Sequence, residues 1–432
     1  MHFTSYLVAA AIAFVAIEAA PASEPGHAFS VQQVSNGKRA FNPALDMLNT
    51  YAKVCNPRNA SRDFWLTILQ QYSKVGAVAP SHVKRAAAAV RTGSVVASPQ
   101  GYDVAYLCPV TVGGKVLNLN CDTGSADLWV YSTLQAASEQ AGHSVYNPKT
   151  GKLISGSTWG IYYGDGSSAS GKAYTDKVVV GPITATKQAV EAATSVSSAF
   201  IADTDKDGLL GMAFSTINTV SPTQQKTWFD NIKAGLSQKL FTVTLKKGAP
   251  GSFDFGFVDK KKYTGSIAYT NVDSSNGFWE FTTGGYAVGS KATNTTPFTA
   301  IAGKSSFRPV IAHQPLTNPP DTGTSIIYMP TNIVKAYYSQ VSGAKFDNNQ
   351  GAWTFPCKAN LPSFSIVVAG QKRTVPGSYM NYAAISDSTC YGGIQDNQGI
   401  GYTILGAVFL KSQFVVFSQA KSTPQLGFAQ QK

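Results

Sequence analysis

A four-residue pattern occurs twice in this chain of 432 residues. Asp122-Thr123-Gly124-Ser125 and Asp321-Thr322-Gly323-Thr324 each join an acid to a glycine and small hydroxyl residues. Each copy is followed at a similar distance by two aliphatic residues and a glycine, first Leu209-Leu210-Gly211 and then Ile404-Leu405-Gly406. One Asp-Thr-Gly is common in turns, but two copies with partners in the same order indicate an internal repeat. The sequence therefore predicts two related lobes, each bringing one carboxyl group to a shared site.

Two carboxyl groups held close together cannot easily both ionise, so the pair shares a proton over a range of acidic pH. The ionised member can take a proton from water, and the protonated member can polarise a carbonyl or protonate a leaving amine. The neighbouring residue types suit this chemistry, because glycine N–H groups and small hydroxyl groups can hydrogen bond to carboxylates. The residues expected to support the acids in this way are Thr123, Gly124, Ser125, Thr322, Gly323 and Thr324.

Several further stretches extend the pattern over nearly the whole chain. They are Ala126-Asp127-Leu128-Trp129, the segment from Tyr163 to Gly171, Gly277-Phe278-Trp279, Val375-Pro376-Gly377, Gly392-Gly393-Ile394-Gln395 and Gln425-Leu426-Gly427-Phe428-Ala429. With these motifs the chain resembles the pepsin-like aspartic proteases, in particular the secreted fungal branch of aspergillopepsins and penicillopepsins. The resemblance implies a mainly β, bilobal fold with lobes related by a pseudo-twofold axis.

The resemblance also implies roles for individual residues. Asp122 and Asp321 would be the catalytic pair. Tyr163 and Gly164 would lie on a mobile hairpin flap, with Trp129 as the hydrogen-bond partner of Tyr163. Asp165 would face the first substrate pocket, where an acid in some relatives admits lysine as well as apolar side chains. A disulfide between Cys357 and Cys390 is implied in the second lobe. Cys108 and Cys121 are expected to be buried thiols outside this disulfide.

The implied activity is that of a secreted aspartic endopeptidase working at acidic pH through a water activated between two aspartates. It needs no cofactor and no metal. An alternative is a catalytically silent peptide-binding relative, impaired by the stretch 303–320 before Asp321 and by Cys121, where the family usually has an aromatic residue. A structural cell-wall protein is a third interpretation. Competing site motifs fail: no His-Glu-x-x-His zinc motif is present, and Asp203, Asp205 and Asp207 lack the later residues of a calcium loop.

The amino-terminal region is expected to be removed in stages. Residues 1–20 read as a signal peptide, with a short apolar run followed by small residues. Residues 21–97 hold nine Lys and Arg against three acids and are interpreted as a pro-segment that inhibits its own enzyme. We expect cleavage between Lys84 and Ala97. The two catalytic lobes would then span residues 98–262 and 263–432.

The partners expected for this chain are protein and peptide substrates. The formal net charge is +12, but no basic motif interleaved with aromatic residues accompanies it, so nucleic acid is not an expected partner. No apolar stretch is long enough for a membrane span. The expectation is a secreted, extracellular monomer. Two helices are predicted, from Ser221 to Gly235 and from Pro330 to Gly343.

Two stretches look foreign to the pattern. Ala300-Ile301-Ala302 is followed by residues 303–320 before Asp321, whereas the family reads Ala-Ile-Ala-Asp-Thr-Gly, and deleting the 18 residues restores that motif. The stretch is polar and rich in proline where a buried strand is expected. Its ends can be encoded by common intron boundaries, and residues from about 54 to 70 share this property. Both are therefore interpreted as retained introns in a gene model, the alternative being a genuine surface loop.

Overall fold

The chain divides into two units, Met1–Arg91 and Thr92–Lys432. The computed structural model describes residues 70, 92–103, 105–163, 166–303, 325–398 and 401–432. The expected signal peptide, nearly all of the expected pro-segment, Gly164, Asp165 and the second motif from Asp321 to Thr324 lie outside the described residues. Apart from residue 70, every described residue belongs to the second unit.

The second unit is built mainly from strands, and its largest sheet has 14 of them. Their main order is β12-β26-β25-β10-β11-β1-β2-β3-β9-β4-β8-β7-β5, with β6 paired to β7. The bounds are β1 (Gly93–Pro99), β2 (Tyr106–Val112), β3 (Lys115–Asp122), β4 (Leu128–Val130), β5 (Lys152–Leu153), β6 (Trp159–Tyr162), β7 (Ser168–Val180), β8 (Ile183–Val196), β9 (Gly208–Gly211), β10 (Leu240–Lys246), β11 (Ala249–Phe255), β12 (Tyr263–Asn271), β25 (Gln413–Ser418) and β26 (Gln425–Gln431).

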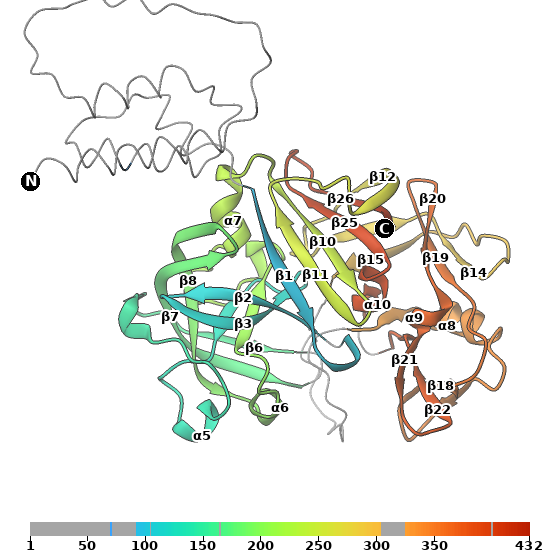
Figure 1. Cartoon of the computed structure of the whole chain (residues 1–432), viewed down its shortest axis with the longest axis horizontal. Helices are drawn as coiled ribbons and strands as arrows, with labels where there is room; N and C mark the ends of the chain where they lie inside the picture. The colour runs from blue at the N-terminus through green and yellow to red at the C-terminus, as the bar shows by residue number, and fades with distance from the viewer. Residues whose placement is uncertain (1–69, 71–91, 104, 164–165, 304–324, 399–400) are drawn as a thin grey trace, which may run out of the picture. The chain divides into compact units, whose positions relative to one another are not determined.

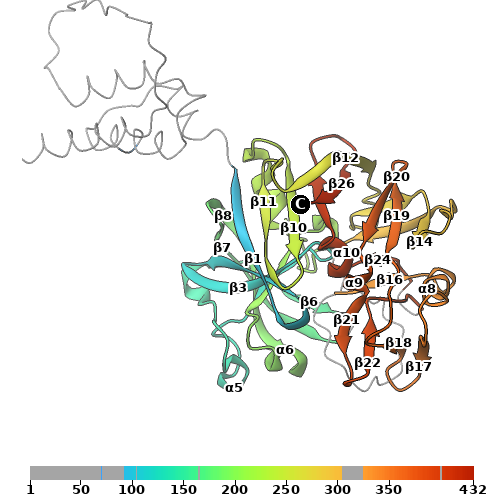
Figure 2. The same cartoon turned by 45° about the vertical axis from the view of Figure 1, so that its right-hand side comes forward.

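Three smaller sheets belong to the second half of the chain, in the orders β13-β15-β24-β16-β23, β14-β19-β20 and β17-β18-β22-β21. Both views of the molecule place β14, β18, β19, β20 and β22 on the opposite side from β7 and β8 (Figures 1 and 2). The bounds are β13 (Glu280–Thr283), β14 (Tyr286–Val288), β15 (Phe298–Ala302), β16 (Ile327–Met329), β17 (Lys345–Asp347), β18 (Ala352–Pro356), β19 (Phe364–Val368), β20 (Gln371–Val375), β21 (Asn381–Ala384), β22 (Thr389–Gly392), β23 (Ile394–Asp396) and β24 (Ile404–Leu405).

Helices in the described part of the chain are short. They are α5 (Ala137–Gln140), α6 (Ser198–Ala202), α7 (Trp228–Ile232), α8 (Thr331–Tyr338), α9 (Gly377–Met380) and α10 (Ala407–Leu410), with 3-10 turns η1 (Gly101–Asp103), η2 (Pro148–Thr150), η3 (Ser215–Ile217) and η4 (Lys233–Gly235). The sequence placed the start of α7 too early, at Ser221-Pro222. Thr227 caps it instead, because its side chain accepts a hydrogen bond from the Asp230 N–H.

The same strand arrangement occurs in both halves and brings the repeated motifs to equivalent places. In the first half β9 lies between β3, to which it is parallel, and β4, to which it is antiparallel. In the second half β24 lies in the same way between β15 and β16. The two aliphatic-glycine partners of the motifs begin in β9 and β24. The prediction of two related lobes is therefore confirmed.

A buried apolar core runs through both halves. The largest cluster of buried side chains includes Leu119 and Leu210 from the first half and Trp279 and Leu405 from the second. The large sheet also joins the halves, because β10 pairs with β25 across the boundary expected at residue 262. A smaller cluster surrounds Trp129 and lies only in the first half.

Candidate active site

Asp122 is the last residue of β3 and is buried, with 1% of its surface exposed. The Gly124 N–H donates to Asp122 Oδ1 at 2.9 Å, and the Ser125 hydroxyl donates to Oδ2 at 2.6 Å. Donors placed in this way stabilise the ionised form of a carboxyl group. The Met212 N–H donates to the Asp122 carbonyl at 2.7 Å, which fixes the backbone of β3 against the chain that follows β9.

Gly211 lets the two segments approach this closely. It lies opposite Asp122 in the parallel pair β3–β9. A Cβ atom at this position would lie 2.5 Å from the Asp127 backbone nitrogen, so only glycine fits. This close approach gives a physical reason for the glycine in the aliphatic-glycine motif.

Tyr163 and Trp129 meet beside Asp122. The Trp129 Nε1–H donates to the Tyr163 hydroxyl oxygen at 2.7 Å, as the resemblance implies. Phe200 packs edge-on against both rings. Burial first, and then the negative charges of Asp127 and Asp122, raises the pKa of the Tyr163 hydroxyl well above its usual value, so it remains neutral. Tyr163 follows β6, which forms a hairpin with β7.

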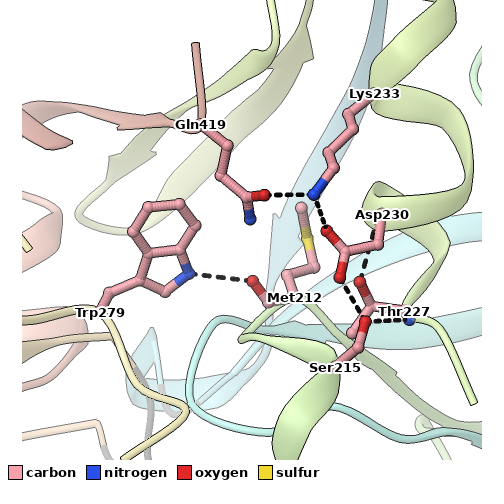
Figure 3. A network of polar contacts seen from close by, with 7 residues as sticks. All are labelled: Met212, Ser215, Thr227, Asp230, Lys233, Trp279 and Gln419. Atoms are coloured by element: carbon pink, nitrogen blue, oxygen red, sulfur yellow. Dashed lines mark hydrogen bonds and ion pairs between the residues drawn. The ribbon is translucent and has the colours of Figure 1, made fainter. Parts of the chain in front are cut away.

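Polar contacts connect the segment after β9 with residues from the second half of the chain (Figure 3). The Trp279 Nε1–H donates to the Met212 carbonyl at 3.0 Å. The Lys233 ammonium group donates at 2.5 Å to both Asp230 Oδ1 and Gln419 Oε1. Trp279 belongs to a motif that the sequence singled out, whereas nothing in the sequence linked Lys233 with Gln419.

The second half builds the same frame around a different residue. Ala302 pairs with Leu405, and the Gly303 N–H donates to the Leu405 carbonyl at 3.3 Å. The next pair along these strands places Gly303 opposite Gly406. Gly303 therefore has the position in the second half that Asp122 has opposite Gly211 in the first. A Cβ atom on Gly303 would lie 2.1 Å from Thr123 Oγ1, so this glycine lies against the first motif.

The residue opposite Gly406 can also be found by counting back along the sequence from β16, and this count gives a different result. Leu128 pairs with Leu210 and lies six residues after Asp122. Ile327 pairs with Leu405 and lies six residues after Asp321. The place opposite Gly406 falls to Gly303 when counted from β15, whereas six residues back from Ile327 is sequence position 321, outside the described residues. The two answers differ by 18 residues, the length of the foreign stretch.

The cysteines and Ala407 lie around this frame. Cys357 and Cys390 form the disulfide that the resemblance implied. Cys108 and Cys121 are buried and outside it, as expected. Ala407, where the family usually has an acid, is buried at the start of α10. Among the described residues no group of three His, Cys, Asp or Glu side chains could hold a metal ion.

Comparison with known proteins accounts for this geometry. The family model described as eukaryotic aspartyl protease matches residues 105–431. Penicillopepsin-1 of Talaromyces stipitatus is 49% identical over 404 residues, covering 93% of this chain and 92% of that protein. The chain belongs to the eukaryotic aspartyl protease family. It is an aspartic-type endopeptidase, and this membership favours the enzyme over the silent peptide-binding alternative.

Other relatives agree. Aspergillopepsin-1 of Aspergillus fumigatus is 51% identical over 362 residues, covering 83% of this chain and 86% of that protein. Aspergillopepsin-1 of Aspergillus oryzae is 46% identical over 430 residues and 99% of both chains. The crystal structure of an aspartic proteinase from Irpex lacteus shares the fold with a TM-score of 0.63 at 24% identity, covering 79% of this chain and 98% of that one. Among the described residues, no helix of this protease is long and apolar enough to cross a membrane.

One group beside the site was not predicted from the sequence. Asp127 and Glu191 are both buried, and the Asn218 side chain contacts each of them. Asp127 lies in a motif that the sequence singled out, but no role was assigned to it. Glu191 gave no signal, because only the parallel pairing of β4 with β8 brings it beside the motif.

Proposed function

We propose that Asp122 and Asp321 are the catalytic pair of this protease and that they activate a water molecule at acidic pH. The observation that supports this most is the duplicated frame: Leu128, paired with Leu210, lies six residues after Asp122, and Ile327, paired with Leu405, lies six residues after Asp321. Gly323 and Thr324 would donate to Asp321 as Gly124 and Ser125 do to Asp122.

In the proposed reaction the ionised aspartate takes a proton from the water as its oxygen attacks the scissile carbonyl carbon. The protonated aspartate gives its proton to the carbonyl oxygen, which forms a neutral tetrahedral intermediate. The C–N bond then breaks as the nitrogen receives the proton now held by the pair and one hydroxyl group of the intermediate returns its proton to the other aspartate, leaving a carboxylic acid and an amine. One proton remains on the pair, so it is ready for the next cycle.

The hairpin of β6 and β7 is proposed to close over the substrate. Tyr163, held by Trp129, would limit solvent at the cut bond. Gly164 and Asp165 would lie at its tip. We expect apolar side chains beside the cut bond, and lysine where it can pair with Asp165.

We further propose that residues 303–320 are absent from the working enzyme. With them removed, Ala302 would lead directly to Asp321, which would then follow the Ala302–Leu405 pair and lie opposite Gly406. The count from β15 and the count from β16 would then give the same residue, Asp321, opposite Gly406. Intact-mass measurement of the secreted protein, or sequencing of its transcript, tests this. Detection of residues 303–320 in an active protein would refute it.

Secretion as a zymogen is the remaining proposal. A signal peptide over residues 1–20 and a pro-segment that inhibits the enzyme would precede the catalytic lobes. Strand β1 narrows the expected cleavage region, because it lies between β11 and β2 from Gly93 onward. Cleavage between Lys84 and Thr92 would leave this strand whole. The working enzyme is expected to be an extracellular monomer.

The deciding experiment is digestion of a mixed peptide library by acid-treated protein lacking residues 303–320. We expect cleavage that a statine-type inhibitor blocks and that Asp122→Asn or Asp321→Asn abolishes. Full activity of Asp321→Asn would contradict the proposed pair.

A further inference from the structure

Two buried acids lie beside the motif that contains Asp122. Asp127 directly precedes β4, and Glu191 lies on β8, where its Cα is paired with that of Trp129. Each has 1% of its surface exposed. One amide group holds their side chains close together, since Asn218 Nδ2 donates to Asp127 Oδ1 at 3.2 Å and to Glu191 Oε1 at 2.8 Å. Ionised carboxylates have no proton to donate, so a hydrogen bond between the two acids requires one of them to be protonated.

The surrounding donors indicate which acid holds the proton. Asp127 Oδ1 accepts from the Thr219 N–H and the Thr219 hydroxyl, both at 2.8 Å, and from Asn218 Nδ2 at 3.2 Å. Glu191 accepts from Asn218 Nδ2 at 2.8 Å and from the Leu128 N–H. In the described part of the chain, Asp127 Oδ2 and Glu191 Oε2 receive no donor. A proton carried by Glu191 and donated to Asp127 supplies that missing hydrogen bond.

In the described part of the chain, no ion pair offsets a second negative charge here, because none of the ion pairs there includes Asp127 or Glu191. Tyr163 lies close enough for the charges of both acids to raise the pKa of its hydroxyl group, and a tyrosine hydroxyl group carries no positive charge. Burial raises the pKa of Glu191 well above its usual value, and the Asp127 charge raises it further. Burial also raises the pKa of Asp127.

We propose that Asp127 and Glu191 share one proton and form a positioning pair whose deprotonation sets the upper pH limit of the enzyme. The activity part of this proposal rests on the proposed function. Asn218 connects the pair to the first motif, because its Nδ2 also donates to the Ala126 carbonyl at 3.2 Å. The Asp127 carbonyl accepts from the Gly211 N–H at 2.9 Å.

Ionising both acids would place two like charges in a buried site. Their repulsion would push β8 away from the segment that connects the Asp122 motif to Trp129, and Trp129 holds Tyr163. The folded state binds the shared proton above about pH 4.3, where a glutamate in the unfolded chain has lost it. The free energy of unfolding therefore falls as the pH rises from there towards the folded-state pKa of the pair.

Glu191→Gln tests this directly, because the amide can still donate to Asp127 but cannot ionise. Glu139→Gln is the matched control, since Glu139 lies in the same half and makes no contact with the pair. Melting temperatures are measured from about pH 4 to about pH 7, with Asp122→Asn in every protein to prevent self-digestion. We expect the melting temperature of Glu191→Gln to equal that of its parent at about pH 4 and to fall much less than the parent's as the pH rises to about 7. Glu139→Gln is expected to show the same fall as the parent.

In proteins that keep Asp122, the upper limb of the pH–activity profile of Glu191→Gln is expected to move up by about one pH unit. Glu191→Ala is expected to melt lower at every pH, since it leaves Asp127 without its donor. A parent-like fall in the melting temperature of Glu191→Gln would overturn the proposal, and so would a loss at acidic pH equal to that of Glu191→Ala. Melting needs no catalysis, so this readout decides the matter even where no peptide is cut.

Discussion

Two hydrogen-bond donors, Gly124 and Ser125, act directly on the Asp122 carboxyl group. The Ser125 hydroxyl bonds to the Asp122 carboxylate at 2.6 Å in a buried site. A hydrogen bond to the ionised form lowers the pKa of an acid, so removing the donor raises it.

Ser125→Ala is therefore expected to move the acidic limb of the kcat/KM profile to higher pH and to reduce kcat/KM about tenfold or more. Peptide hydrolysis measured across the acidic range checks both effects, with the exposed Ser155→Ala as control. An unshifted acidic limb would count against Asp122 as the acid that must ionise.

The hydrogen bond between Trp129 and Tyr163 should contribute measurably to the free energy of unfolding. Tyr163→Phe removes the hydroxyl and leaves the buried Trp129 Nε1–H without this acceptor. The free energy of unfolding is expected to fall by about 1–3 kcal/mol. Urea unfolding of the inactive Asp122→Asn background measures it, and an unchanged midpoint would show that the bond contributes nothing.

At the scale of elements, the close crossing of β9 and the first motif depends on Gly211. In Gly211→Ala the new methyl group meets backbone at 2.5 Å and cannot be relieved by a side-chain movement. The free energy of unfolding is expected to fall by about 3 kcal/mol, which is at the upper end of the range for overpacked sites. Gly160→Ala is the control, since its Cβ would meet only Ser170 Cβ at 3.7 Å. Equal melting temperatures for the two variants would disprove the requirement for glycine.

Elements set by local residues were predictable, and those set by distant partners were not. The turn that joins β2 to β3 is set by local residue types, because Gly113 and Gly114 both have positive φ, at 57° and 91°, which favours glycine. The start of α7 was missed because Pro222 suits a first helical turn, yet the Thr227 side chain provides the cap. The helix predicted from Pro330 to Gly343 ends at Tyr338.

The same division holds for the candidate site. Asp122, Gly124 and Ser125 are close in sequence, and their hydrogen bonds follow from the motif itself. Glu191 reaches Asp127 only through the pairing of β4 with β8, and Lys233 reaches Gln419 across 186 positions. No local pattern contains such long-range contacts.

At the scale of the whole molecule, β1 connects the beginning of the second unit to the large sheet (Figure 1). Val95 and Ala97 are buried, and the Ser94 hydroxyl donates to the buried Asp254 at 2.5 Å. Loss of this strand would expose the edges of both β11 and β2.

A protein beginning at Thr92 is therefore expected to melt cooperatively, whereas one beginning at Gln100 should not. Calorimetry of the two proteins checks this, and sequencing the amino terminus of the acid-activated enzyme should give a residue no later than Gly93. An active enzyme that begins beyond Pro99 would show that β1 is dispensable.

The proposed catalytic pair requires Asp321, rather than Gly303, to lie opposite Gly406 in the working enzyme. A crystal structure of the secreted protein with a statine-type inhibitor tests this most directly. We predict that Asp321 follows Ala302 there and that the carboxyl groups of Asp122 and Asp321 both hydrogen bond to the inhibitor hydroxyl. An inhibited enzyme with Gly303 opposite Gly406 and Asp321 away from the inhibitor would contradict the account.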